Sequence, residues 1–129
     1  MYRSFQILLI EDDANDRALI AHELSTRLNG VRVCSESEAS GIAVALERGG
    51  FDLVITDYDL GWTNGLVLLK EFKAHWPSIP VIVCSGNPSA DLARRAIEIG
   101  AIQFVEKCSS GFPQLLRAVE NVWSDCGRK

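Results

Sequence analysis

Short apolar runs alternate along the chain with longer segments in which apolar residues recur every three or four positions. The short runs predict five strands, and the periodic segments between them predict five helices. The predicted strands are residues 6–10, 31–35, 53–57, 80–85 and 102–106. They are mostly apolar, which is typical of strands that helices cover on both faces of a parallel sheet. The pattern therefore predicts an α/β fold, a doubly wound (βα)5 unit with right-handed crossovers.

Glycine, proline and serine mark the expected ends of the helices. In the first helix three apolar residues recur every four positions: Ile20, Leu24 and Leu28. The second helix is expected to begin at Ser37 or Ser40 and to end at the glycine pair 49–50. The other predicted helices are residues 64–76, 89–99 and 112–123. Because no linker or repeat interrupts this alternation, residues 1–129 are expected to form one domain.

Composition narrows the classes of function. The chain of 129 residues is long enough to bury a hydrophobic core without disulfides. Its net charge of −4 argues against direct binding to nucleic acid. No apolar stretch is long enough to cross a bilayer, and the N-terminal residues turn acidic too early for a signal peptide. The four cysteines have no metal-ligand spacing. We therefore expect reduced thiols and a cytoplasmic protein.

Polar residues collect where the predicted strands end. Four strands end in such residues: the first at Glu11, Asp12 and Asp13, the third at Asp57 and Asp59, the fourth at Ser85, Gly86 and Asn87, and the fifth at Lys107. The second strand ends without a candidate. In an open parallel sheet, ligands bind outside the carboxyl ends of the strands, so these side chains are expected to share one edge of the fold.

This set of groups favours phosphoryl chemistry with a metal ion. Clustered carboxylates repel one another unless a cation shares their site. Oxygen ligands suit Mg²⁺, which usually takes phosphate as a further ligand. A lysine ammonium and a serine hydroxyl can then bind phosphoryl oxygens, and an aspartate can itself be the nucleophile.

Each of these residues also has an ordinary structural interpretation. Asp13 and Asn15 are best explained as residues that cap the following helix, and Asn64 with Gly65 as a turn that starts another. Taken singly, Ser85 and Lys107 are more often plain surface or strand-end residues. Their coincidence at four strand ends of one sheet favours a shared site.

Four stretches resemble the motifs of two-component response-regulator receiver domains. They are ILLIEDD at 7–13, DYDLGWTNG at 57–65, VIVCSG at 81–86 and GAIQFVEK at 100–107. The resemblance covers nearly the whole chain, and Arg17 fits the arginine often found early in the first helix. It implies a flavodoxin-like fold with strand order 2-1-3-4-5 and a phosphoryl-accepting signalling domain rather than a conventional enzyme.

The resemblance also implies a role for each site residue. Asp57 would be the phosphoacceptor, and Mg²⁺ would bind to Asp12, Asp57, the backbone carbonyl of Asp59 and, through water, Glu11. Lys107 and the Gly86 amide would bind phosphoryl oxygens, Ser85 and Phe104 would form the switch, and the side chains of Asp59 and Asn87 would tune the rates. The implied partners are a histidine kinase or histidine phosphotransfer protein and an unknown downstream protein, with no direct contact to nucleic acid or membrane. The domain would catalyse its own phosphorylation and slow dephosphorylation.

Three residues depart from the family pattern. Gly61 stands where proline is usual, which predicts a looser loop after Asp57. Cys108 replaces the proline that usually follows the lysine, so the state of the Lys107–Cys108 peptide, usually cis in the family, stays open. Phe104 lacks the hydroxyl of the commoner tyrosine.

Two alternatives come from other classes. One is a receiver-like binding module that is never phosphorylated. The other is a Toprim-like Mg²⁺-dependent nucleic-acid enzyme, whose site also has a glutamate and a D-x-D pair after strands, although Ser85 and Lys107 would then have no role. A haloacid dehalogenase-type phosphatase would carry D-x-D on its first strand, whereas here it follows the third. The sequence leaves open whether the chain is a stand-alone regulator, a phosphorelay intermediate or part of a hybrid kinase.

Overall fold

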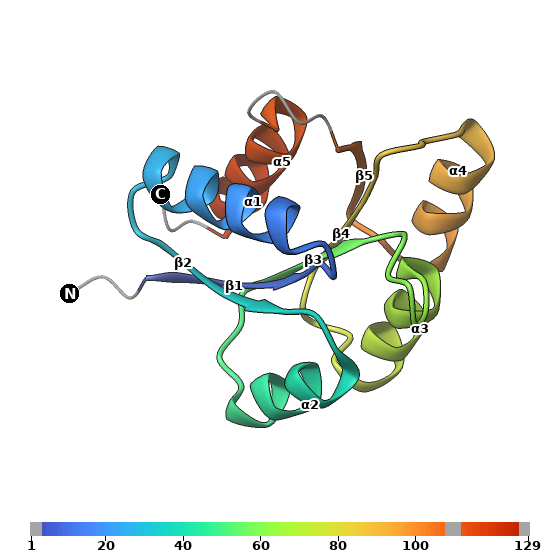
Figure 1. Cartoon of the computed structure of the whole chain (residues 1–129), viewed down its shortest axis with the longest axis horizontal. Coiled ribbons are helices and arrows are strands. Elements are labelled where there is room, and N and C mark those ends of the chain that lie inside the picture. The colour runs from blue at the N-terminus through green and yellow to red at the C-terminus, as the bar shows by residue number, and fades with distance from the viewer. Residues whose placement is uncertain (1–3, 108–111, 127–129) are drawn as a thin grey trace.

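The protein is an α/β sandwich in which a parallel sheet lies between two layers of helices, as seen in the computed structural model (Figure 1). The structure describes residues 4–107 and 112–126. The strands are β1 (Phe5–Ile10), β2 (Val31–Glu36), β3 (Leu53–Asp57), β4 (Val81–Ser85) and β5 (Gln103–Glu106). The helices are α1 (Ala14–Arg27), α2 (Ala39–Arg48), α3 (Gly65–His75), α4 (Ala90–Ile99) and α5 (Pro113–Asp125). The strand order is β2-β1-β3-β4-β5, so the predicted fold class and topology are confirmed.

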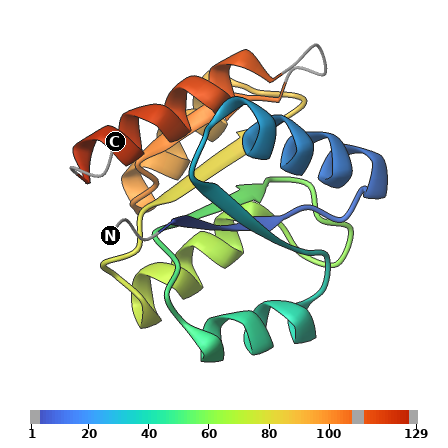
Figure 2. The same cartoon turned by 90° about the vertical axis from the view of Figure 1, so that its left-hand side faces the viewer.

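Two hydrophobic cores lie on opposite faces of the sheet. Successive side chains of a strand point to opposite faces, so Ile7 and Leu9 of β1 enter one core while Leu8 and Ile10 enter the other. Helices α1 and α5 cover the first core, and α2, α3 and α4 cover the second (Figures 1 and 2). The continuous apolar character of the strands follows from this double cover.

Most helix starts follow the side-chain caps expected from the sequence. Asp13, Asn64 and Ser89 accept backbone N–H bonds at the starts of α1, α3 and α4. The prediction that Ser37 or Ser40 begins the second helix is wrong: α2 begins after Glu38, whose side chain makes no cap bond. The carboxylate of Glu36 instead fills the space beside Gly41 in the first turn, where a negative charge is favourable.

Parallel pairing brings the polar strand ends to one edge of the sheet. Asp57 of β3 pairs with Cys84, the neighbour of Ser85 on β4, and Ser85 pairs with Glu106, the neighbour of Lys107. The loops that follow these strands therefore open on the same side. Over residues 4–107 and 112–126, no helix has both the length and the apolar character needed to span a membrane.

Candidate functional site

The loop after β1 presents two adjacent carboxylates with different surroundings. Glu11 is buried, whereas Asp12 is exposed. The Glu11 N–H donates to the Glu36 carbonyl at 3.1 Å, which extends the β1–β2 pairing by one residue. The Arg17 guanidinium donates to the Glu11 carbonyl at 2.9 Å. These bonds fix the backbone, so the two acidic side chains leave it at a defined place.

The turn from β3 into α3 holds Asp57 close to that loop. Tyr58 N–H donates to the Cys84 carbonyl, and Gly65 N–H donates to the Tyr58 carbonyl, both at 2.8 Å. A Cβ at Gly65 would lie 2.7 Å from the Asp57 carbonyl oxygen, so only glycine fits at this approach. Asp57 itself is buried, with 4% of its surface exposed. The spacing between Asp57 and Gly65 therefore closes a compact loop beneath the carboxylate.

Gly61 gives this loop a backbone conformation that proline cannot adopt. Its φ is +59°, whereas proline is fixed near −65°. A Cβ at this position would also lie 2.9 Å from Asp12 Oδ2. The loop is anchored on both sides of Gly61, because Leu60 is fully buried and Asp59 pairs with Asn64 across the turn. The looser loop stays a prediction. Here glycine permits a different loop conformation and lets the Asp12 carboxylate lie against it.

Lys107 places an ammonium group among three carboxylates. Its backbone N–H donates to the Ser85 carbonyl at 2.8 Å, which sets the start of the side chain at the end of β5. Its Nζ lies 3.0 Å from Glu11 Oε1, 3.0 Å from Asp16 Oδ2 and 3.2 Å from Asp57 Oδ1. The loop after β1, helix α1 and strand β3 therefore meet at this nitrogen.

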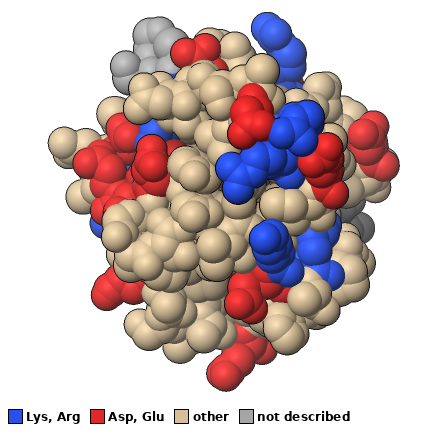
Figure 3. Space-filling model, turned by 90° about the vertical axis from the view of Figure 1, so that its right-hand side faces the viewer, with Lys and Arg blue, Asp and Glu red and all other residues tan. Residues whose placement is uncertain are grey.

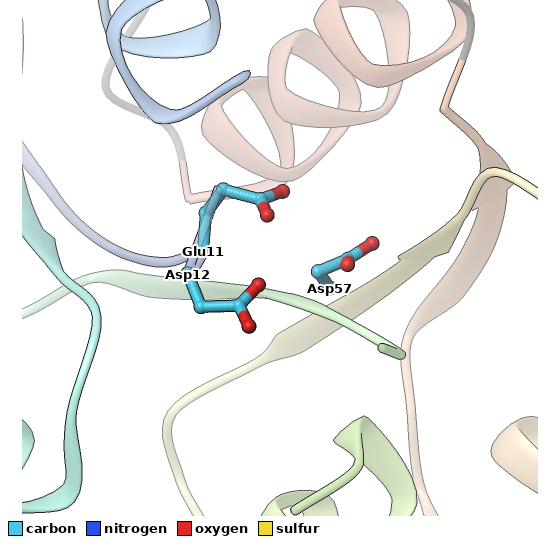
Figure 4. A group of neighbouring side chains, drawn as sticks. All are labelled: Glu11, Asp12 and Asp57. Carbon is cyan, nitrogen blue, oxygen red and sulfur yellow. The ribbon is translucent and has the colours of Figure 1, made fainter. Parts of the chain in front are cut away.

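Three carboxylates form a group that could hold a metal ion. Glu11, Asp12 and Asp57 each offer one oxygen, and these oxygens lie within 4.8 Å of one another. Figure 4 shows the Glu11 and Asp12 side chains leaving their loop toward the side on which Asp57 lies. Asp57 Oδ1 is buried and has no hydrogen-bond partner among the described residues, because Lys107 is near it without hydrogen-bond alignment. A set of carboxylate oxygens that includes a buried oxygen without a hydrogen bond suits a hard divalent cation.

The electrostatics of the group are those of crowded acids around one lysine. Burial and the charge of Asp57 raise the pKa of Glu11 to about 6, although Lys107 opposes this rise. Burial also raises the pKa of Asp57, against the lowering effect of Lys107. Burial lowers the pKa of Lys107, but contacts with Asp16 and Glu11 outweigh it and raise that pKa above its usual value. The lysine thus stays charged, while Glu11 and Asp57 resist ionisation.

The other predicted site residues lie around this centre. Ser85 is buried, and its Oγ accepts the Asn87 N–H at 3.1 Å. Gly86, Asn87 and the Asp59 side chain are exposed, and Phe104 is half-buried against the core beneath α2, α3 and α4. Their predicted roles concern states that involve a phosphoryl group and remain predictions. The Lys107–Cys108 peptide lies outside the described residues.

Sequence reasoning missed two acidic residues of this region. Asp16 contacts Lys107, and its position in the first turn of a helix that follows the acidic loop is a signal that could have indicated it. Glu36 ends β2, the strand thought to end without a candidate, but its carboxylate lies against Gly41 and within 3.8 Å of the Cys34 thiol rather than in the acidic group. Only Asp16 enlarges the site.

The topology and the acidic group define a flavodoxin-like α/β protein with a candidate cation site at the carboxyl ends of its strands. The family model described as the response regulator receiver domain matches residues 7–120. The chain belongs to this family, and it is a receiver domain of the kind found in two-component response regulators.

Individual relatives agree with this assignment. The transcriptional regulatory protein FixJ of Azorhizobium caulinodans is 33% identical over 110 residues, which are 83% of this chain and 50% of that protein. The two-component response regulator ARR2 of Arabidopsis thaliana is 25% identical over 98% of this chain and 18% of its own length. The chain thus spans half or less of these curated relatives. A response regulator receiver domain protein from Clostridium thermocellum has a TM-score of 0.81 at 26% identity, covering 95% of this chain and 97% of that one.

Proposed function

We propose that this domain accepts a phosphoryl group from a phosphohistidine onto Asp57 and thereby switches a protein-binding surface. The observation that carries the proposal is the setting of Asp57. Its carboxylate is buried, lies 3.2 Å from the Lys107 ammonium and belongs to the group of three acids. A nucleophile so placed has both a cation ligand set and a fixed positive charge at hand.

The transfer step needs only one bond made and one broken. A carboxylate oxygen of Asp57 would attack phosphorus, the bond from phosphorus to the imidazole nitrogen would break, and that nitrogen would keep the electron pair and take up a proton. Asp12, Asp57 and the Asp59 carbonyl are the proposed Mg²⁺ ligands, with Glu11 acting through water. When bound, Mg²⁺ would neutralise charge on the phosphoryl oxygens.

Lys107, Ser85 and Gly86 would bind the new phosphoryl group. The Lys107 ammonium already lies beside Asp57 Oδ1, so little movement is needed for it to contact a phosphoryl oxygen. The Ser85 hydroxyl, whose oxygen accepts the Asn87 N–H, would donate its hydrogen to a phosphoryl oxygen. The half-buried Phe104 would then move further inward and change the surface around β5, as a local charge event with a wider effect.

The proposed partners are a histidine kinase or histidine phosphotransfer protein upstream and a protein target downstream. The net charge of −4 argues against direct binding to nucleic acid. Figure 3 shows acidic side chains gathered on one side of the face it presents and charges of both signs elsewhere, without a continuous basic surface on that face. We also propose that the domain is a cytoplasmic signalling module rather than a conventional enzyme, and that it extends over residues 1–129.

Family membership does not favour the Toprim-like alternative, which also leaves Lys107 without a role. One experiment distinguishes our proposal from the alternative of a receiver-like binding module that is never phosphorylated. Wild type, Asp57→Asn and the exposed control Asp125→Asn are incubated with phosphoramidate and Mg²⁺. We expect base-labile phosphoryl incorporation in wild type and Asp125→Asn and none in Asp57→Asn. No incorporation into wild type would favour the binding module, and equal incorporation into Asp57→Asn would exclude Asp57 as the acceptor.

A further inference from the structure

Asp16 lies in the site but has no role in the proposed function. Its carboxylate lies as close to the Lys107 ammonium as that of Glu11 does. It lies in the first turn of α1, and its backbone N–H is held by the Asp13 cap at 2.8 Å. Its Oδ2 lies 3.0 Å from Lys107 Nζ. The side chain of Asp16 is 30% exposed and that of Lys107 is 13% exposed. The ion pair is therefore partly shielded from water, unlike an ordinary surface pair.

The ammonium of Lys107 is shared among three carboxylates. A lysine carries three N–H donors, and three carboxylates lie around this one. The contact with Asp57 is the poorest of the three, because Asp57 Oδ1 lies 3.2 Å away and lacks a hydrogen bond from any described residue. The Lys107 ammonium is thus hydrogen-bonded to Glu11 and ion-paired with Asp16, each at 3.0 Å, and both contacts are shorter than the one with Asp57.

We propose that Asp16 is a positioning residue that competes with the phosphoryl group for Lys107 and so weakens the hold of the domain on that group. This inference rests on the proposed function. A phosphoryl group on Asp57 would have to share the ammonium with Asp16, whose carboxylate already lies 3.0 Å from it. Asp16 also adds a negative charge close to the anion, since both contact the same nitrogen. Both effects lower the affinity for an anion at Asp57.

The same charge has the opposite effect on the metal ion. Asp16 is outside the group of three acids that could hold a cation, but its charge favours any divalent cation nearby. Removing the charge should therefore weaken Mg²⁺ binding slightly while strengthening anion binding. A purely structural role would weaken both, because a displaced α1 would disturb the loop that carries Glu11 and Asp12. The opposite signs distinguish the proposed role of Asp16 from a purely structural one.

The test compares Asp16→Asn with Asp13→Asn. The control removes one charge at the same helix start and keeps a capping side chain. Among the described residues, the ion pairs of Lys107 are with Glu11, Asp16 and Asp57 and do not include Asp13. Binding of beryllofluoride, a phosphoryl mimic, is titrated at saturating Mg²⁺, and Mg²⁺ is titrated alone. We expect Asp16→Asn to bind beryllofluoride about three- to tenfold more tightly and Mg²⁺ about twofold more weakly, from a unit charge at this range near the surface. Asp13→Asn should change beryllofluoride binding by less than about twofold.

A second readout does not depend on phosphoryl chemistry. The ammonium hydrogens of Lys107 exchange slowly with water while carboxylates hold them, so their ¹⁵N–¹H resonance should be resolved in the metal-free wild type and Asp13→Asn. It should broaden in Asp16→Asn and recover in Asp16→Glu. Unchanged or weaker beryllofluoride binding in Asp16→Asn, or an unchanged resonance, would overturn the inference. A wild type that binds Mg²⁺ but no beryllofluoride would overturn the proposed function, while the resonance comparison would still decide whether Asp16 holds Lys107.

Discussion

Asp57→Asn is expected to stabilise the metal-free domain while removing its proposed chemistry. The substitution keeps the size of the side chain and removes one charge from a crowded buried group. Two carboxylates 4.8 Å apart repel by about 3–4 kcal/mol at an effective dielectric constant near 20. Asp57 has two such neighbours, Glu11 and Asp12, at or within that separation.

One attraction opposes this repulsion. The Lys107 ammonium, 3.2 Å from Asp57 Oδ1, attracts the carboxylate by about 5 kcal/mol on the same scale. Repulsion therefore exceeds attraction by about 2 kcal/mol, burial of the charge adds to the cost, and solvent around Asp12 reduces it. We expect Asp57→Asn to raise the free energy of unfolding by about 1–2 kcal/mol and Tm by about 3–8 °C. The pKa of Asp57 is raised, mainly by burial, which also indicates that its negative charge destabilises the metal-free folded state.

The expected gain in stability of Asp57→Asn over wild type must depend on pH and on Mg²⁺. Because the pKa of Asp57 is higher in the folded state than its usual 3.8, the unfolded chain loses its proton first, and wild-type stability falls as pH rises through this interval. The advantage of Asp57→Asn should therefore be present at pH 7 and vanish below about pH 3.8. Saturating Mg²⁺ should reverse it, since ligand binding stabilises wild type more.

Urea unfolding at pH 7 without and with Mg²⁺ measures these changes, with Asp125→Asn as the matched control in the exposed last turn of α5. The control should shift stability by less than about 0.5 kcal/mol in either condition. A metal-free Asp57→Asn protein that is less stable than wild type would refute the electrostatic account of the site. A gain that persists unchanged in Mg²⁺ would separate the acidic group from metal binding.

Three further substitutions test separate parts of the site. Lys107→Ala should weaken beryllofluoride binding at least about tenfold without weakening Mg²⁺ binding, and the reverse pattern in titrations would contradict its role. Asp59→Asn should change the dephosphorylation rate severalfold and leave Mg²⁺ affinity nearly unchanged, since its backbone carbonyl is retained; a large loss of Mg²⁺ affinity would assign the metal to its side chain. Gly65→Ala should cost about 1–3 kcal/mol in urea unfolding, because its Cβ would lie 2.7 Å from the Asp57 carbonyl oxygen. Gly86→Ala, whose Cβ would meet nothing within 4 Å, is its control, and an equal loss in both would refute the steric argument.

The strands and most helix ends could be predicted because each depends on local sequence. The predicted strand LVITD has the observed bounds of β3, Leu53–Asp57, because three apolar residues follow polar Asp52 and lead to polar Thr56 and Asp57. Asn64 and Ser89 cap their helices as residues of that type do. The predicted start of α2 was wrong because the negative charge at its first turn comes from Glu36. This residue lies on the preceding strand, so no capping motif next to the helix indicates it.

The site could be predicted in outline because a parallel sheet collects the ends of its strands. The meeting of Glu11, Asp12, Asp57 and Lys107 could be expected, because parallel pairing brings the carboxyl ends of β1, β3 and β5 to one edge. The contact of Asp16 with Lys107 could not be predicted in this way, since it depends on the angle at which α1 leaves the acidic loop. The positive φ of Gly61 is likewise invisible in a motif that usually has proline there.

The most direct test of the central claim is to locate the phosphoryl group by chemical trapping. Wild-type protein is phosphorylated with phosphoramidate and Mg²⁺, treated with borohydride, which reduces an aspartyl phosphate to homoserine, and digested for peptide mass spectrometry. We predict homoserine at residue 57, dependent on both the phosphodonor and Mg²⁺. Homoserine at Asp12 or Asp59 instead, or at no position in a protein that has taken up phosphoryl groups, would contradict the assignment of Asp57 as the phosphoacceptor.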